Sequence, residues 1–181
     1  KSFFFLYFTI MSVLKILTIP DKRLKYKSLN VENFDDKLKI DINNMYDTLY
    51  SSDNGIGLAA PQVNIHKRIV VIDIKEDSGA SNPLTLINPK IINKSKEKHI
   101  NQEGCLSIPG YFSEVERAIE IEYEWFSVEG NMSKSMASGL LSICIQHEID
   151  HLDGILFIDY LSSIKKKFAL EKVLKFQKKD K

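Results

Sequence analysis

The sequence has 181 residues, 44% hydrophobic and 27% charged, which suits a single domain with a substantial core and argues against two. The formal net charge is +1, so the whole chain has no strong electrostatic attraction to DNA or to a membrane surface. Its two cysteines, Cys105 and Cys144, cannot form a disulfide scaffold and fit thiols used for packing or for metal binding.

Residues 3–11 form a strongly apolar run near the start of the chain. The run is too short to span a bilayer as a helix, which takes about 20 apolar residues. Two interpretations stay open: a remnant of a targeting segment, or a strand or tail that packs on the body. We therefore divide the chain into residues 1–13, the leader or targeting remnant, and residues 14–181, a single domain.

The stretch 31–49 has the pattern of an amphipathic helix with one buried face. Its apolar residues recur at spacings of three and four: Val31, Phe34, Leu38, Ile42, Met45 and Leu49. Asn30 or Asn33 is expected to cap this helix. The following run 55–62, Gly-Ile-Gly-Leu-Ala-Ala-Pro-Gln, has small residues that let a backbone or ligand approach closely. Taken alone, such a run more often marks a tight packing point than a binding loop.

Three segments have the composition of β-strands. Residues 68–74 form a continuous apolar run typical of a buried strand, and residues 84–92 form a second run, interrupted by a proline. Residues 118–125 alternate apolar and acidic side chains, as expected of an antiparallel strand with one face in water. The acidic side is best interpreted as a solvated face, and Gly130-Asn131 is expected to form the turn that follows.

A largely apolar helix is predicted from Ser135 or Ser138 to residue 152, with Gly154 ending it in a left-handed conformation. It contains His147-Glu148-Ile149-Asp150-His151, an H-E-x-x-H pattern. Residues four apart lie on one helix face, so the two imidazoles can hold one divalent cation, with Glu148 beside it as a proton shuttle. Two core histidines satisfied by hydrogen bonds are the weaker alternative, because Glu148 would be equally costly to bury unpaired.

A catalytic tetrahedral site usually has three protein ligands and one open position, so a third ligand is needed. Cys144 lies on the same helix face as the histidines and could reach the metal. Cys105 lies upstream in Glu-Gly-Cys-Leu-Ser-Ile-Pro-Gly, a segment bracketed by glycines and a proline. We favour Cys105, because a thiolate from a separate segment encloses the cation. Cys144 is more simply a small apolar packing residue.

Three motifs together make the sequence resemble the peptide deformylase family: residues 55–62, then Glu-Gly-Cys-Leu-Ser at 103–107, then Gln146 to Gly154. The similarity covers nearly the whole chain, from residue 14 to residue 159. It implies an α+β fold with antiparallel sheets around the central motif helix, a helix before the first motif and another at the C-terminus. It makes residues 14–181 one catalytic domain.

The resemblance implies a metal-dependent hydrolase that removes the formyl group from N-terminal formyl-methionine of newly synthesised proteins. The metal would be Fe2+, with Zn2+, Ni2+ or Co2+ able to substitute, held by Cys105, His147 and His151. Glu148 would accept a proton from water and deliver it to the departing amine. The developing oxyanion would be held by the backbone N–H of Leu106 and the side-chain amide of Gln62.

The resemblance also assigns the substrate-binding surface. Gly57 is expected where the substrate backbone lies in a strand-like pairing. The methionine pocket is expected to be lined by Ile56, Leu140, Ile143 and Cys144. Arg117 matches a family arginine, and we expect it to pair with Glu103.

One departure from the family pattern is Asn64, where a glycine is usual after Ala-Pro-Gln-Val. Asparagine tolerates a left-handed backbone, so the turn is expected to survive.

The expected partners are N-formyl-methionyl nascent peptides, with no DNA and no membrane span. The helix predicted over 164–178 is rich in lysine, and bacterial relatives use this end to approach the ribosome, so a transient ribosome contact is a hypothesis. Formylated starts belong to bacteria, mitochondria and plastids. The apolar leader favours an organelle stroma, with plastid ahead of mitochondrion or bacterial cytoplasm.

Two rival functions are carried forward. A zinc endopeptidase of the H-E-x-x-H class shares the helix and the general base, but normally takes its third ligand downstream, where Asp153, Asp159 and Glu171 are the carboxylates available. The upstream Cys105 argues against it. A non-catalytic structural or binding protein is the second rival, and the presence of the complete set of candidate catalytic residues argues against that.

Overall fold

The computed structural model describes residues 12–52, 54–75 and 79–179. In chain order the helices and strands are α1 (Asp36–Tyr50), β1 (Gly57–Ala59), β2 (Ile69–Asp73), β3 (Pro83–Lys94), β4 (Lys98–Gly104), β5 (Phe112–Ala118), β6 (Glu120–Phe126), β7 (Met132–Ser138), α2 (Gly139–Leu152) and α3 (Ser163–Lys179). Short 3-10 turns occupy Lys22–Lys25, Ala60–Val63 and Phe157–Tyr160. The α+β prediction is confirmed.

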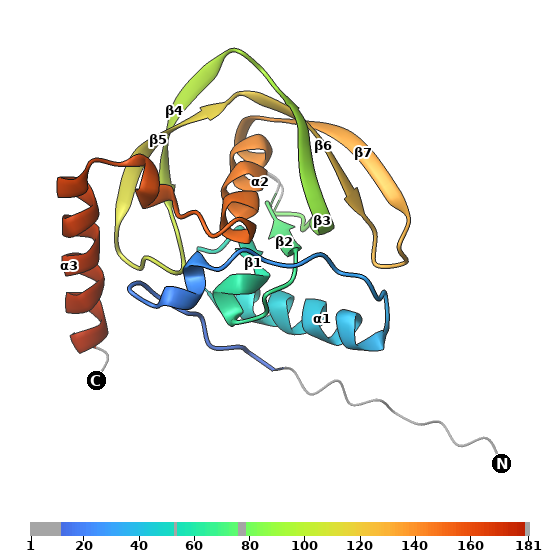
Figure 1. Cartoon of the computed structure of the whole chain (residues 1–181), viewed down its shortest axis with the longest axis horizontal. Coiled ribbons are helices and arrows are strands. Elements are labelled where there is room, and N and C mark those ends of the chain that lie inside the picture. The colour runs from blue at the N-terminus through green and yellow to red at the C-terminus, as the bar shows by residue number, and fades with distance from the viewer. Residues whose placement is uncertain (1–11, 53, 76–78, 180–181) are drawn as a thin grey trace.

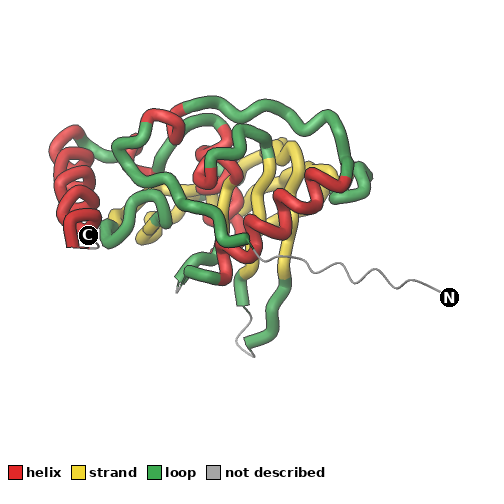
Figure 2. Tube along the Cα trace, turned by 90° about the horizontal axis from the view of Figure 1, so that it is seen from below, coloured by secondary structure: helices red, strands yellow, loops and turns green. Residues whose placement is uncertain are grey.

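The strands form two antiparallel sheets. One has the order β1-β2-β3-β6-β7, and the other is the pair β4-β5. The strands arch over α2, which lies in the middle of the molecule, while α3 stands apart at one end (Figure 1). In the view from below, α1 runs across the strands on the side nearer the reader (Figure 2). The predicted central position of the motif helix is confirmed.

Strand β2 explains why the core has two layers. All five of its residues are buried, as its continuous apolar sequence predicted. Successive side chains of a strand point to opposite faces. Val70 and Ile72 accordingly pack in the cluster that includes Ile145 of α2, whereas Ile69 and Val71 pack in the cluster that includes α1. The sheet therefore lies between the two helices, with α2 packed against one of its faces.

Several boundaries of helices and strands differ from the predicted ones. The N-cap of α1 is Asp35, whose carboxylate accepts from the backbone N–H of Leu38 at 2.9 Å, so the expected caps Asn30 and Asn33 are wrong. The chain directly before Asp35 is not helical, and its apolar residues pack in the same cluster as α1 from an extended segment. Ala118 belongs to β5, and the alternating strand begins at Glu120.

Other expectations about the backbone are confirmed. Helix α2 ends at Leu152, and Gly154 has a φ of 74°, the predicted left-handed position. Asn64 has φ 64° and ψ 25°, so the turn after Ala-Pro-Gln-Val survives without glycine. Gly130 forms the turn between β6 and β7.

The expectation for residues 1–13 falls mainly on residues 1–11, which lie outside the described part of the chain. Within the described ranges, none of the helices combines the length and the apolar character that crossing a membrane requires.

Candidate active site and metal centre

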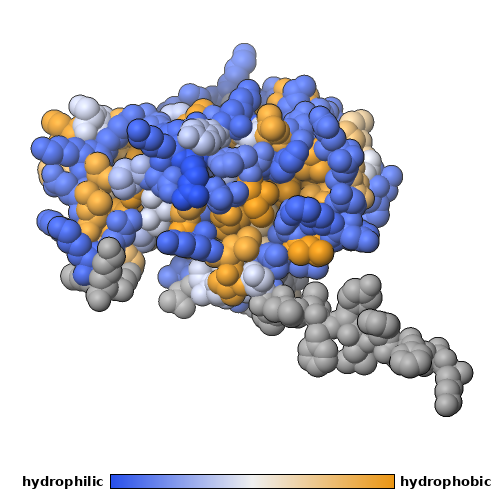
Figure 3. All heavy atoms as spheres, turned by 60° about the horizontal axis from the view of Figure 1, so that its bottom comes forward, coloured by the Kyte–Doolittle hydropathy of each residue, from blue (hydrophilic) through white to orange (hydrophobic). Residues whose placement is uncertain are grey.

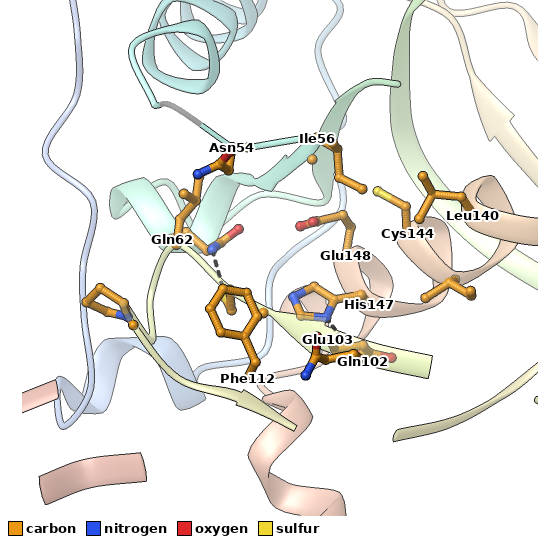
Figure 4. Close-up of a pocket in the computed structure, with 18 residues that line it drawn as sticks. Asn54, Ile56, Gln62, Gln102, Glu103, Phe112, Leu140, Cys144, His147 and Glu148 are labelled. Atoms are coloured by element: carbon orange, nitrogen blue, oxygen red, sulfur yellow. Dashed lines mark hydrogen bonds and ion pairs between the residues drawn. The ribbon is translucent and has the colours of Figure 1, made fainter. Parts of the chain in front are cut away.

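A cavity of about 390 Å³ opens between β1, the segment after β4 and one face of α2. The close-up shows Leu140, Cys144, His147 and Glu148 of α2 on one side of this space and Gln62 facing them (Figure 4). All the residues expected at the site line the cavity except His151, which is buried. The full lining is Asn54, Gly55, Ile56, Gly57, Gln62, Gln102, Glu103, Gly104, Cys105, Leu106, Pro109, Gly110, Phe112, Leu140, Ile143, Cys144, His147 and Glu148.

The structure brings Cys105, His147 and His151 together. One ligand atom from each lies within 4.8 Å of the other two, and the Cys105 Sγ is 3.2 Å from His151 Nε2. The two histidines are one turn apart on α2, and Cys105 follows β4 directly. Cys144 stands apart from this group. Burial, with the nearby Glu148 carboxylate, raises the pKa of the Cys144 thiol well above its ordinary value, so Cys144 stays neutral.

The orientation of His147 is set by a carboxylate. Its Nδ1 lies 2.8 Å from Glu103 Oε2 and donates to it, so Nε2 is the ring nitrogen left for a metal. Burial alone would lower the pKa of His147, but its hydrogen bonds with Cys105 and Glu103 raise that pKa well above its ordinary value, so the ring must give up its Nε2 proton when a metal binds. A ligating histidine typically donates its second nitrogen to such a carboxylate. Glu103 itself is held by Arg117, whose Nε and Nη2 donate to its two oxygens at 2.6 and 3.0 Å. The expected Arg117–Glu103 pair is therefore present.

A buried charge network continues beyond Arg117. Its Nη1 lies 2.5 Å from Asp150 Oδ2, and the hydroxyl of Tyr160 donates to the same oxygen at 3.0 Å. Burial alone would raise the pKa of Glu103, but the hydrogen bonds from Arg117 and His147 outweigh it and lower that pKa to about 2. Glu103 is therefore a fixed negative charge beside His147, one of the candidate metal ligands.

Glu148 is the buried acid of the cavity. Its side chain is 4% exposed, and its Oε2 has no hydrogen-bond partner among the described residues. Burial raises the pKa of Glu148 to about 7, although the charge of His147 acts in the opposite direction. An unpartnered buried carboxylate is costly, so its position at the cavity wall points to a functional role.

Gln62 is fixed by both ends of its amide. The backbone N–H of Ala59 donates to its Oε1 at 2.8 Å, so the amide nitrogen must face the other way. That nitrogen donates to Ser107 Oγ at 3.1 Å and lies 3.4 Å from Cys105 Sγ. The amide donor is thus held beside the sulfur of the candidate metal ligand Cys105. Leu106, the other residue expected to stabilise an oxyanion, also lines the cavity.

The residues expected to bind substrate line the same cavity. Gly57 lies on β1, at the edge of the five-stranded sheet, and a Cβ added there would lie 2.6 Å from Glu148 Oε1. The apolar wall combines Ile56, Leu140, Ile143 and Cys144. Leu140 is half exposed and Cys144 is buried, so the wall runs from the mouth of the cavity to its floor.

Sequence reasoning missed several contributors. Ser107 stood within a recognised motif, but its contact with Gln62 depends on tertiary structure. The hydrogen bond of Glu103 to His147 was missed for the same reason. Phe112 and Gln102 flank the Glu-Gly-Cys-Leu-Ser motif and line the cavity. Their closeness in sequence to that motif is the one feature from which a position at the cavity could have been predicted.

The donor set suits a divalent transition metal. One thiolate and two neutral imidazoles are typical ligands of zinc and of other borderline metals. Burial and the neighbouring His147 lower the pKa of His151 well below its ordinary value, which keeps its imidazole neutral and able to coordinate.

The three downstream carboxylates that could supply the third metal ligand of an endopeptidase lie outside the candidate metal site. Asp153 accepts from Arg68 at 2.7 Å, Asp159 pairs with Lys25, and Glu171 lies on the exposed helix α3. None of these three belongs to the cluster of potential ligand atoms found within the described residues.

Comparisons with known proteins agree on one family. The family model described as polypeptide deformylase matches residues 13–167. The chain is 45% identical to a peptide deformylase of Zymomonas mobilis, with 93% of this chain and 97% of that protein covered. It is 48% identical to peptide deformylase 2 of Vibrio cholerae, covering 93% and 98% of the two chains. The crystal structure of Ehrlichia chaffeensis peptide deformylase in complex with actinonin superposes with a TM-score of 0.86, at 44% identity and covering 91% and 98%.

Proposed function

Because this chain belongs to the polypeptide deformylase family, we propose that Cys105, His147 and His151 hold the divalent metal ion that this family uses. The enzyme hydrolyses the formamide of N-terminal formyl-methionine on newly made proteins. The observation that supports the residue assignment is the meeting of these three ligand atoms within 4.8 Å near the buried Glu148, whose Oε2 has no hydrogen-bond partner in the described part of the chain.

Glu148 is the proposed proton carrier. The bound cation supplies a Lewis acid that lowers the pKa of water toward neutrality. Glu148 accepts the proton that the attacking water loses as its oxygen bonds to the formyl carbon. It then delivers that proton to the amine nitrogen as the C–N bond breaks, releasing formate and the free amine.

Two donors are proposed to hold the formyl oxygen as it gains negative charge: the Gln62 amide and the backbone N–H of Leu106. The contacts of Gln62 with Ala59 and Ser107 support this role, because they aim the amide nitrogen toward the site before substrate arrives. A donor that is already oriented needs no reorganisation during the reaction.

The substrate is proposed to lie along β1. Its backbone would pair with the edge at Gly57, where the absence of a side chain allows close approach beside Glu148. The methionine side chain would then occupy the apolar wall formed by Ile56, Leu140, Ile143 and Cys144. This arrangement presents the formyl group to the metal-binding residues.

Anaerobic purification, metal analysis and assay of formyl-Met-Ala beside acetyl-Met-Ala test the assignment. We propose Fe2+ as the working metal and expect the iron-loaded enzyme to hydrolyse only the formyl peptide. Cys105→Ser should lose bound metal, and Glu148→Gln should retain metal and lose activity by a factor of about 10²–10⁴. Full metal content in Cys105→Ser would overturn the ligand set and revive the endopeptidase.

A ribosome contact through α3 is proposed as well. The helix carries Lys165, Lys166, Lys167, Lys172 and Lys175, which ribosomal RNA would attract electrostatically. Sedimentation with ribosomes at low salt tests it, and absence of co-sedimentation would contradict it.

The apolar leader led us to propose a plastid, but the Zymomonas and Vibrio relatives are bacterial and support a bacterial cytoplasm at least as well. A reporter fused to residues 1–20 tests the organelle, and failure of import into isolated plastids and mitochondria would contradict it.

A further inference from the structure

A second hollow lies beside the catalytic cavity, between the start of β5 and α3. It is a groove of about 310 Å³ lined by Tyr111, Phe112, Phe168, Glu171, Lys172 and Lys175. Phe112 lines both hollows, so they share one wall. The close-up shows the Phe112 ring at the edge of the catalytic cavity (Figure 4). The groove is therefore the next hollow that a peptide leaving the cavity past Phe112 would meet.

The two sides of the groove are held in place before anything binds. The ring of Tyr111 stacks on Phe157 with 6.3 Å between centroids, and its hydroxyl donates to the backbone carbonyl of Lys165 at 3.3 Å. Helix α3 is anchored by Ala169 and Val173, which are fully buried. A preformed groove costs little ordering when it binds a peptide.

The groove combines aromatic surface with positive charge. Phe112 and Phe168 are 62% and 59% exposed, and apolar atoms lie open among hydrophilic ones at the α3 end of the molecule, at the left of Figure 3. Lys172 and Lys175 are exposed on the same groove. Its single acid, Glu171, lies 4.0 Å from Lys167 Nζ. Apolar and acidic groups would therefore both be favoured here.

We propose that this groove binds the part of the nascent chain that follows the residues held in the catalytic cavity, and that it favours an apolar side chain followed by acidic ones. The inference rests on the proposed function, because the substrate must first occupy the cavity beside Glu148. An extended peptide advances about 3.3–3.6 Å per residue, so a dipeptide of about 7 Å stays in the cavity and a heptapeptide of about 24 Å extends beyond it.

The test compares kcat/KM of the metal-loaded enzyme on three substrates: formyl-Met-Ala, formyl-Met-Ala-Ser-Phe-Glu-Asp-Ala, and the same heptapeptide with lysines in place of its two acids. In Lys172→Glu/Lys175→Glu we expect kcat/KM for the acidic heptapeptide to fall about two- to fivefold, the upper part of the range measured for exposed charge pairs. The lysine heptapeptide should improve and formyl-Met-Ala should be unchanged. Lys165→Glu/Lys178→Glu changes the same charge on α3 outside the groove and should affect none of the three.

A second variant tests the aromatic surface. Phe168→Ala should lower kcat/KM for both heptapeptides and spare formyl-Met-Ala. Unchanged heptapeptide rates in both groove variants would overturn the proposal. If those variants instead weaken only sedimentation with ribosomes, the lysines serve ribosomal RNA and the groove proposal is again wrong. Failure of the wild-type enzyme on formyl-Met-Ala would be different, because it would count against the proposed site itself.

Discussion

Gly57→Ala is the substitution for which the structure makes the sharpest prediction. A Cβ at this position would lie 2.6 Å from Glu148 Oε1 and 2.8 Å from Cys144 Sγ. Both atoms belong to buried residues of α2, which is packed against the sheet, so neither can move away freely. The added methyl group must therefore displace the carboxylate, the thiol or β1 itself.

The cost follows from the size of this overlap. Adding a methyl group to a well-packed core typically costs about 1–3 kcal/mol. Alanine also restricts the unfolded chain, which offsets about 0.4–1 kcal/mol. We expect the free energy of unfolding of Gly57→Ala to fall by about 1–2 kcal/mol, a drop in Tm of about 2–8 °C for a domain of this size. A shift of about 1 Å in Glu148 should lower kcat/KM by about 100-fold.

The assay combines thermal unfolding, metal content and hydrolysis of formyl-Met-Ala. Metal content should stay at the wild-type value, because the atoms nearest to the added Cβ belong to Glu148 and Cys144 and not to the proposed ligands. The double variant Gly57→Ala/Cys144→Ala removes one of the two clashes, so it should regain part of the lost Tm and stay poorly active. Activity of Gly57→Ala within threefold of wild type at an unchanged Tm would refute the claim that this glycine leaves room for the carboxylate.

Three further predictions concern stability. Arg117→Ala leaves the buried Glu103 charge without its main partner, so the free energy of unfolding measured by urea titration should fall by about 3–5 kcal/mol. Lys98→Ala removes an exposed ion pair and should lower it by less than about 1 kcal/mol; equal decreases in the two variants would contradict the reasoning. A chelator should lower the Tm of the metal-loaded wild type and leave His151→Ala unaffected, since a metal that binds only the folded state stabilises it. For Asp73, a hydrogen bond from a serine hydroxyl, helped by a backbone N–H and a tyrosine hydroxyl, lowers the pKa of the carboxyl group. The stability that this carboxylate contributes is therefore present above the unfolded pKa and is lost as pH falls through the lower folded pKa. The free energy of unfolding of wild type should exceed that of Asp73→Asn by about 1–2 kcal/mol at pH 7, and this difference should shrink below about pH 4; a difference that grows there would contradict the sign.

The parts of the fold that sequence could predict are those set by local chemistry. The apolar run of β2 and the three-four spacing in α1 identified both elements, because burial on one or two faces imposes those periods directly. The start of α1 was misplaced because Val31 and Phe34 continue the helical spacing while packing from an extended segment. An apolar pattern records which side chains are buried, and it does not record which backbone conformation buries them.

In the site, too, the features set by local sequence could be predicted and those that depend on tertiary structure could not. The spacing of His147 and His151 places both on one face of α2 by helix geometry alone. The choice between Cys105 and Cys144 needed an argument about enclosure, since helix geometry permits both. The hydrogen bond from His147 to Glu103 could not be found this way, because it requires β4 to pass beside α2. The groove next to Phe112 could not be predicted from any local sequence pattern. It exists only where α3 packs beside β5, and its residues share no periodic spacing. Substrate preferences beyond the methionine should therefore be sought in how α3 is docked, and relatives with the same motifs but a differently placed C-terminal helix should prefer different downstream residues.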